Sequence, residues 1–268
     1  MIPAEFRYRR ASSVDEALDL LTEHGEDAKA LAGGHSLLPL MKLRLAAPEV
    51  LVDLGALDEL RYVRQDGDTI AIGAMTRYHD LHRDGVLRTH APLLAHVAGV
   101  VGDPQVRHRG TIGGSVAHAD PAADVPAAIL ASDGVLVVRG PNGGRTVPAV
   151  EFFDGPFTTV LAPDELLTEI RVPSRAGIGW GFERFTRRAT DWAIVGVAAV
   201  GGAVALMNMA GTPIRAAAVE AALAAGASTA EAAELAADGT SPADEPHASA
   251  DYRRHLARVL TGRVLAAR

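Results

Sequence analysis

Two glycine pairs, each followed closely by a hydroxyl side chain, have the residue types and spacing that suit phosphate binding. The first pair is Gly33 and Gly34 in LAGGHS, and the second is Gly113 and Gly114 in TIGGS. Glycine lets the backbone approach a phosphate closely and lets several N–H groups point the same way. Two such loops suit the two phosphates of a dinucleotide, held from opposite sides. On the residues alone, ordinary turns remain an open alternative.

The usual phosphate-binding motifs are absent from the sequence. It contains no G-x-x-x-x-G-K-[ST], and its only lysines are Lys29 and Lys42, so a P-loop has no lysine to use. No G-x-G-x-x-G opens a helix after a strand, so a standard Rossmann site is unsupported. Any dinucleotide site must therefore rest on the two glycine pairs.

The chain contains no cysteine, which excludes disulfides, thiolate zinc sites, a catalytic thiol and cysteine-ligated iron–sulfur clusters from it. Any redox chemistry therefore needs an organic cofactor. His79 and His82 are the best candidates for a metal site, but no third ligand follows at a recognisable spacing. We interpret them as surface histidines on a polar helix and expect no metal.

Composition limits the partners. The net charge is −7, and the basic residues are scattered, so we expect no nucleic acid. No run approaches the roughly 20 apolar residues that span a bilayer, and the start of the chain lacks the apolar core of a signal peptide. The sequence therefore predicts a cytoplasmic protein with no membrane span.

The elements that must position the first glycine pair alternate between helix and strand. Ser13 and Glu16 fit a capping box, and Gly25 supplies a stop. The hydrophobic pattern predicts a helix over 12–25, a strand over 29–34, a helix over 35–46 and a strand over 49–55. This alternation predicts a small α/β lobe with parallel strands over 1–55.

The pattern changes after residue 55. Apolar-alternating runs flank Asp66-Gly67, a strong hairpin signal, and further antiparallel strands are expected over 134–153 and 165–173. We predict a middle α+β lobe over 56–172. The remainder, 173–268, begins with a strand and ends in alanine-rich helical segments at 216–238 and 249–267.

Four stretches together carry a family resemblance: AGGHSLLPLMKLRLAAPEVLVDL (32–54), RHRGTIGGSVAHADPAADVPAAILA (107–131), RFTRRATDWAIVGVAA (184–199) and SADYRRHLARVL (249–260). In this order they resemble the FAD-binding medium subunit of the molybdenum hydroxylases. That family includes the flavin subunit of aerobic carbon monoxide dehydrogenase and the flavin parts of xanthine dehydrogenase-type enzymes. The resemblance covers nearly the whole chain.

The resemblance implies an α+β protein with the FAD-binding fold of p-cresol methylhydroxylase and vanillyl-alcohol oxidase. FAD then lies between the lobes 1–55 and 56–172, and a C-terminal α+β lobe, 173–268, covers the flavin. The stretch ALMNMAGTPIRA (205–216) is shorter than the family pattern by enough for one strand. We therefore expect a shortened C-terminal lobe.

The resemblance also implies the residues that bind FAD. The pyrophosphate loops correspond to Ala32, Gly33, Gly34, His35, Ser36 and Leu37, and to Thr111, Ile112, Gly113, Gly114 and Ser115.

Four further positions match the family near the cofactor, and each has a plainer alternative. Asp124 would accept hydrogen bonds from cofactor hydroxyls, or would cap the following helix. Lys29 and Arg184 match basic positions, or are solvated charges. Trp192 would shield one face of the flavin, or is a core tryptophan.

The function implied is that of a FAD-dependent oxidoreductase subunit of a molybdenum hydroxylase complex. It would pass electrons from a small partner subunit with two [2Fe–2S] clusters to an external acceptor, while a large molybdopterin subunit oxidises the substrate. No catalytic residue is assigned, and neither His35 nor His118 is expected to act as one. The alternatives are a stand-alone FAD oxidoreductase and a non-catalytic nucleotide-binding module. The substrate, the acceptor (quinone, oxygen or NAD) and the stoichiometry are not predicted.

Overall fold

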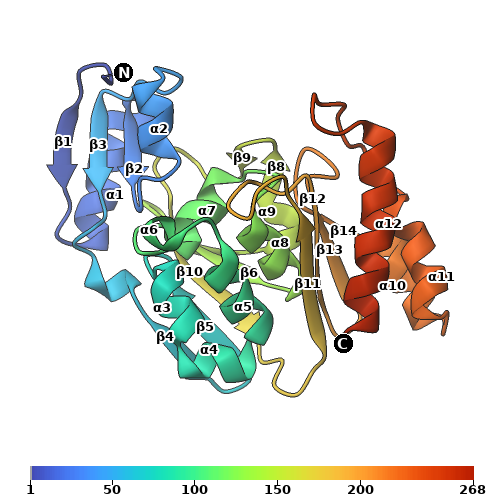
Figure 1. Ribbon diagram of the computed structural model, residues 1–268. Coiled ribbons are helices and arrows are strands. Elements are labelled where there is room, and N and C mark those ends of the chain that lie inside the picture. Colours follow the sequence, from blue (N-terminus) through green and yellow to red (C-terminus); the bar gives the residue numbers. More distant parts are fainter. Residues whose placement is uncertain (1) are drawn as a thin grey trace.

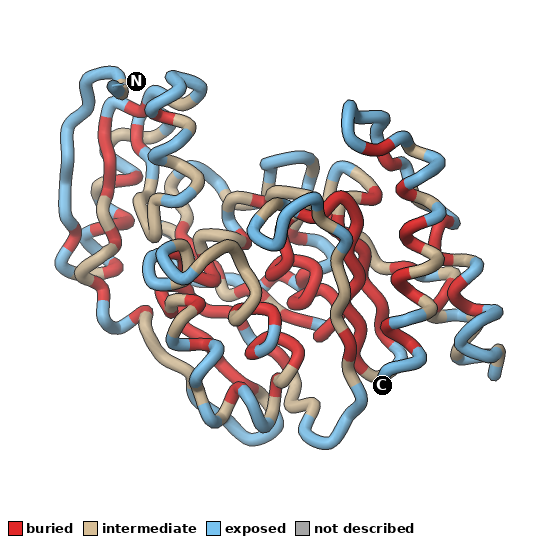
Figure 2. Tube along the Cα trace, viewed as in Figure 1, coloured by how far each residue is buried: buried red, intermediate tan, exposed pale blue. Residues whose placement is uncertain are grey.

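Three main sheets follow one another along the chain, each packed against helices of its own (Figure 1). The structure is a computed structural model that describes residues 2–268. Buried residues concentrate between the sheets and their helices, while connecting loops are exposed (Figure 2). The chain is a mixed α and β protein, as the sequence predicts. The lobe boundaries at residues 55 and 172 stay a prediction.

The N-terminal sheet is parallel, with strand order β1-β3-β2. Its elements are β1 (Arg7–Arg10), α1 (Val14–His24), β2 (Ala28–Leu31), α2 (Leu37–Lys42) and β3 (Val50–Asp53). The parallel pairing is confirmed. β1 was not predicted, because all of its residues are exposed and it has no apolar alternation.

Both predicted helices of this part form, with differences at their ends. Ser13 accepts the Glu16 N–H at 3.1 Å, but the Glu16 carboxylate accepts from the Ser12 N–H, so only half of the predicted capping box forms. α2 ends before residue 46, as Arg44 adopts a positive φ of 58° that stops the helix.

The middle sheet is antiparallel, with order β4-β5-β10-β6-β7. Its strands are β4 (Val63–Asp66), β5 (Thr69–Gly73), β6 (Val135–Gly140), β7 (Gly143–Pro148) and β10 (Leu166–Pro173). β8 (Phe153–Gly155) pairs with β9 (Thr158–Thr159). The predicted hairpin is confirmed, with Gly67 at a positive φ of 58° in its turn.

The helices of the middle part cover this sheet and contribute most of the largest core cluster. They are α3 (Tyr78–Arg83), α4 (Gly85–His90), α5 (Pro92–Val100), α6 (Pro104–Arg107), α7 (Ile112–His118), α8 (Asp124–Ala131) and α9 (Ala149–Phe152). α8 is buried along its whole length, because it also packs on the C-terminal sheet.

The C-terminal sheet is a four-stranded antiparallel sheet of β11 (Trp180–Phe185), β12 (Val195–Val200), β13 (Ala203–Met207) and β14 (Ile214–Arg215). α12 (Ala250–Ala266) packs on β11 and β12. The segment predicted as helical over 216–238 is broken into α10 (Ala217–Ala224) and α11 (Thr229–Glu234), because Gly226 turns the chain at a φ of +86°. The shortening of this lobe stays a prediction.

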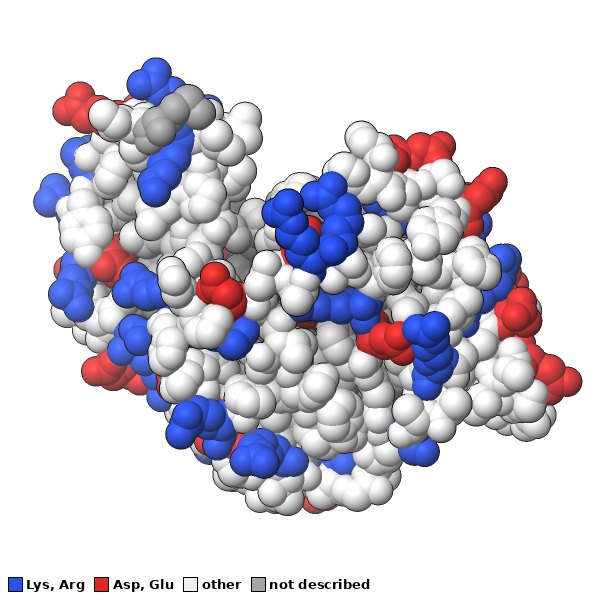
Figure 3. All heavy atoms as spheres, viewed as in Figure 1, with Lys and Arg blue, Asp and Glu red and all other residues white. Residues whose placement is uncertain are grey.

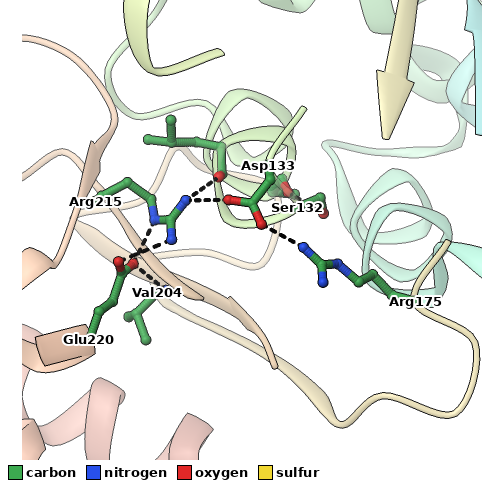
Figure 4. A network of polar contacts seen from close by, with 8 residues as sticks. Ser132, Asp133, Arg175, Val204, Arg215 and Glu220 are labelled. Carbon is green, nitrogen blue, oxygen red and sulfur yellow. Dashed lines mark hydrogen bonds and ion pairs between the residues drawn. The ribbon is translucent and has the colours of Figure 1, made fainter. Parts of the chain in front are cut away.

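A network of ion pairs joins the middle part to the C-terminal sheet (Figure 4). Asp133, just after α8, accepts from Arg215 at 2.7 Å and from Arg175 at 2.5 Å. Arg215 also donates to Glu220, whose carboxylate accepts the Val204 N–H at 2.8 Å. These contacts fix the positions of α8, β13 and α10 relative to one another.

Within residues 2–268, no helix combines the length and the apolar character needed to cross a membrane.

Candidate functional site

The first glycine loop leaves β2 and enters α2 with its backbone donors unused. Within residues 2–268, the N–H groups of Gly33, Gly34, His35 and Ser36 donate to no protein acceptor. Gly34 takes a φ of +78°, which favours glycine, and the Ser36 side chain makes no capping hydrogen bond. Consecutive free N–H groups of this kind form a site for an anion.

The second loop is used differently. Thr111 caps α7, and the donors that follow it are already satisfied: Ile112 N–H by Thr76 at 3.0 Å, Gly113 by Ala74 at 2.9 Å, Gly114 by the Thr111 hydroxyl at 3.2 Å, and Ser115 by the Thr111 carbonyl at 3.2 Å. The expectation that both loops present donors therefore applies to the first loop only. The second loop is anchored to β5 and the turn after it.

The structure brings the two loops into contact. A Cβ on Gly33 would stand 2.4 Å from the Arg109 carbonyl oxygen and 2.9 Å from the Gly110 Cα. A Cβ on Gly114 would lie 3.5 Å from the Ala32 Cβ. The glycines are needed here because backbone packs directly on backbone.

Asp124 and Arg184 form a buried ion pair. Arg184 Nη1 lies 2.5 Å from Asp124 Oδ2, and its other nitrogen donates to the carbonyl oxygens of Val100 at 2.7 Å and Ala189 at 3.1 Å. The solvated-charge alternative for Arg184 is therefore wrong. Ala123, not Asp124, occupies the N-cap position of α8, so the capping alternative for Asp124 is also wrong.

The Asp124 carboxyl has one unused acceptor. Its side chain is 6% exposed, and Oδ1 is buried with no hydrogen-bond partner within the described chain. Burial raises the pKa of Asp124 to about 7, and the Arg184 guanidinium opposes that rise. An unpaired buried acceptor is costly unless a donor reaches it. A bound molecule with hydroxyl groups would supply such a donor.

Tyr78 lies next to this pair and was missed by the sequence reasoning. It is 5% exposed, and burial raises the pKa of its hydroxyl well above the usual range, with Asp124 adding to the rise and the neighbouring Ser115 hydroxyl opposing it. A tyrosine at the start of a helix reads as a core residue, so the sequence held no signal for its position.

Lys29 and Trp192 stand apart from that buried cluster. Lys29 is exposed on β2 and forms no ion pair with a described residue. Trp192 is 59% exposed in the connection from β11 to β12, so the core-tryptophan alternative is wrong. In the space-filling view the molecule is hollowed between the N-terminal sheet and the rest of the chain (Figure 3).

The histidines show no arrangement for acid–base work. His35 is exposed, whereas His118 packs on Phe157 with ring centroids 5.2 Å apart, and burial lowers its pKa. His79 stacks on His108 with centroids 3.9 Å apart. Within residues 2–268, no group of three or more His, Cys, Asp or Glu could hold a metal ion.

The comparisons with known proteins agree along the whole chain. The family model described as the FAD binding domain in molybdopterin dehydrogenase matches residues 4–175, and the CO dehydrogenase flavoprotein C-terminal domain matches residues 180–267. The carbon monoxide dehydrogenase medium chain of Hydrogenophaga pseudoflava is 45% identical, over 99% of this chain and 97% of that one.

Two further comparisons extend this result. The glyceraldehyde dehydrogenase medium chain of Sulfolobus acidocaldarius is 42% identical, over 74% of this chain and 70% of the relative. A chain in the structure of carbon monoxide dehydrogenase from Hydrogenophaga pseudoflava superposes with a TM-score of 0.96 at 46% identity, covering 100% of this chain and 98% of that one.

Proposed function

The chain belongs to the family of FAD-binding medium subunits of the molybdenum hydroxylases, and we propose that it acts there as the electron-transfer subunit of such a complex. In this role it holds FAD between iron–sulfur clusters on a partner subunit and an external acceptor. The observation that carries the proposal is the row of free N–H groups at 33–36, beside a second glycine loop that contacts it.

The residues present fit FAD. Four consecutive unused donors suit its pyrophosphate, and the unpaired Oδ1 of Asp124 suits a hydroxyl of its ribityl or ribose part. Without such a hydroxyl, nothing in this fold explains why the Asp124 carboxyl beside Arg184 is buried at the cost of its desolvation free energy.

Each predicted residue has a distinct task in this proposal. The first loop, from Ala32 to Leu37, binds the pyrophosphate, and Thr111 to Ser115 support that loop by packing. Arg184 holds Asp124 in position with its free oxygen available. Lys29, exposed on β2, would supply a positive charge near the cofactor, and the exposed ring of Trp192 would shield the flavin.

FAD, when bound, supplies an exchange of one or two electrons, which suits a position between one-electron clusters and a two-electron acceptor. The chain needs no general acid or base for this task. Because it contains no cysteine, the clusters must belong to another polypeptide. We propose a small [2Fe–2S] subunit and a large molybdopterin subunit as its partners.

The substrate is set outside this chain in this proposal. The two medium-chain relatives named above come from enzymes for carbon monoxide and for glyceraldehyde, two chemically different substrates. Medium chains that are each similar to this one therefore occur in enzymes with different substrates. This is expected if the large subunit selects the substrate.

The test of FAD binding uses a variant that should keep the fold. Ser36→Asp places a carboxylate among the free donors, where it competes with the pyrophosphate and repels it. Aspartate is a favoured N-cap residue, so α2 should persist. We expect FAD absorbance in the repurified parent and at least a tenfold (about 1.4 kcal/mol) weaker affinity in the variant.

Two matched variants complete this test. Ser36→Asn keeps the size without the charge, and Ser13→Asp adds the same charge at the N-cap of α1; both should bind FAD nearly as the parent does. FAD is measured in the chain alone and in the complex with its partner subunits. If Ser36→Asp binds FAD as tightly as the parent does, both as the isolated chain and in the complex, pyrophosphate binding at the first loop is contradicted.

The electron-transfer role has its own test. In the complete complex, the complex's substrate should bleach the flavin absorbance, and removal of the iron–sulfur subunit should abolish the bleaching. Bleaching of the isolated FAD-loaded chain by the same substrate would support the stand-alone oxidoreductase and contradict the proposal.

A further inference from the structure

A cavity of about 290 Å³ lies at the carboxyl ends of β1 and β3. We call it the arginine cavity, because Arg10, Arg61, Arg77 and Arg109 line it together with Tyr8 and Asp53. Several Lys or Arg side chains lie close together on the face of the molecule where the N-terminal sheet meets the middle part (Figure 3). Carboxyl ends of parallel strands are a common position for ligands in α/β sheets.

The positive charge of the arginine cavity is only partly compensated. Arg61 pairs with Asp58 and donates to the Gly55 carbonyl. The side chains of Arg10, Arg77 and Arg109 form no ion pair or hydrogen bond within residues 2–268. Three free guanidinium groups around one small cavity repel one another, although the chain as a whole carries a charge of −7.

The carboxylate in the arginine cavity does not offset this charge fully. Asp53 accepts from the Tyr8 hydroxyl and from the Gly55 N–H at 2.8 Å, so its oxygens are already engaged. Arg61 Nε is buried without a partner in the described chain. The cavity therefore presents unused donors and an excess of positive charge, while its one carboxylate already accepts hydrogen bonds from the protein.

We propose that the arginine cavity binds a small phosphate-bearing anion at a site separate from that of FAD. Planar guanidinium groups match the oxygens of phosphate with paired hydrogen bonds, which a chloride ion cannot do. The volume accommodates a phosphate, a pyrophosphate or the phosphate end of a nucleotide, and is too small for a whole dinucleotide.

The arginine cavity differs from the proposed FAD site in the residues that form it. Of the residues predicted to hold FAD, Ala32 and Thr111 alone line it, and the free N–H groups of Gly34 to Ser36, Asp124, Arg184 and Trp192 do not. Each glycine loop thus contributes one residue to its wall. An anion bound there is thus next to the FAD site but not in it.

The test is calorimetric titration of inorganic pyrophosphate into the full chain, with and without FAD, at an ionic strength matched with potassium chloride. With FAD loaded, so that the first glycine loop is occupied, we expect one site in the parent and at least a tenfold loss of affinity in the double variant Arg10→Gln with Arg77→Gln, roughly the loss of one charge-assisted hydrogen bond. Arg88→Gln, at an exposed arginine of α4, is the matched control and should bind as the parent does.

The outcomes separate the proposal from its rivals. Parent affinity no better than that of the double variant would overturn the site, and loss of pyrophosphate binding on loading FAD would assign the cavity to FAD instead. Titrations with orthophosphate and AMP identify the source: tighter binding of AMP indicates a nucleotide, and equal binding indicates free phosphate.

A folding control keeps the result interpretable. Removing two mutually repelling charges should leave the thermal unfolding temperature of the double variant unchanged or higher, while pyrophosphate should raise that of the parent only. Should the double variant fold poorly, the single variant Arg10→Gln, at an exposed strand end, provides the same comparison.

Discussion

The Cα of Gly33 lies against the main-chain carbonyl of Arg109, so closely that a Cβ at residue 33 would stand 2.4 Å from that oxygen. Gly33 has no positive φ, so its backbone conformation alone does not require glycine. The requirement comes from packing, because the first glycine loop rests on the segment that leads into the second. The distance between the two loops is thereby set by a main-chain contact.

Gly33→Ala should lower the free energy of unfolding by about 2 kcal/mol, the usual cost of forcing a methyl group into a filled site. Gly85→Ala is the matched control, because no atom lies within 4 Å of the position that a Cβ at residue 85 would take. Gly85 is also the first residue of α4, and alanine is more favourable than glycine in a helix by up to about 1 kcal/mol. Urea unfolding measures both. Equal stabilities of the two variants would contradict the contact between the loops.

Asp124 should make the stability of the protein depend on pH in one direction. Its pKa in the folded state is raised to about 7 by burial, above the value of 3.8 expected when unfolded. The stability that protonation of Asp124 contributes to the folded state is therefore fully present below about pH 4 and is lost as the pH rises through about 7. Asp124→Asn has no such titration.

Urea unfolding of the parent and of Asp124→Asn at pH 5 and at pH 8 measures this effect. The stability of the parent relative to the variant should be greater at the lower pH. If the difference in unfolding free energy between parent and variant is the same at both pH values, or greater at pH 8, the pKa of Asp124 is not raised in this way.

Trp192→Ala should separate a cofactor role from a structural one. Since the ring is 59% exposed, its removal should change the free energy of unfolding by less than about 0.5 kcal/mol. If it shields the flavin, reduced FAD in the variant should be reoxidised by oxygen faster than in the parent. Trp192→Phe keeps a ring and should stay close to the parent; equal rates in all three proteins would exclude shielding.

Asp133→Asn should weaken the connection between the middle part and the C-terminal sheet. This carboxylate serves both Arg215 and Arg175, and we expect a loss of about 1 kcal/mol, modest because the Asp133 side chain is 49% exposed. The control is Asp251→Asn, which removes the exposed pair with Arg254 and should cost less than about 0.5 kcal/mol. Thermal unfolding compares them, and equal costs would contradict a special role for the network.

Much of the fold follows from patterns within a few residues of one another. The turn at Asp66-Gly67, the N-cap at Ser13 and the alternation of helix and strand around the first loop were predicted because turn and cap chemistry is local. The break at Gly226 was missed because alanine is equally favourable on both sides of it, so composition alone favours one long helix.

By itself, the sequence determined that this protein carries paired glycine loops, lacks cysteine and has the family pattern of a FAD-binding medium subunit. Only the tertiary structure decided which loop keeps its N–H groups free, that β1 pairs beside β3, and that Arg184 reaches Asp124, a partner 60 positions away. The physical reason is that caps and turns depend on neighbouring residues, whereas these contacts join residues far apart in the chain; the pair of Asp124 and Arg184, for example, forms where α8 packs on the C-terminal sheet.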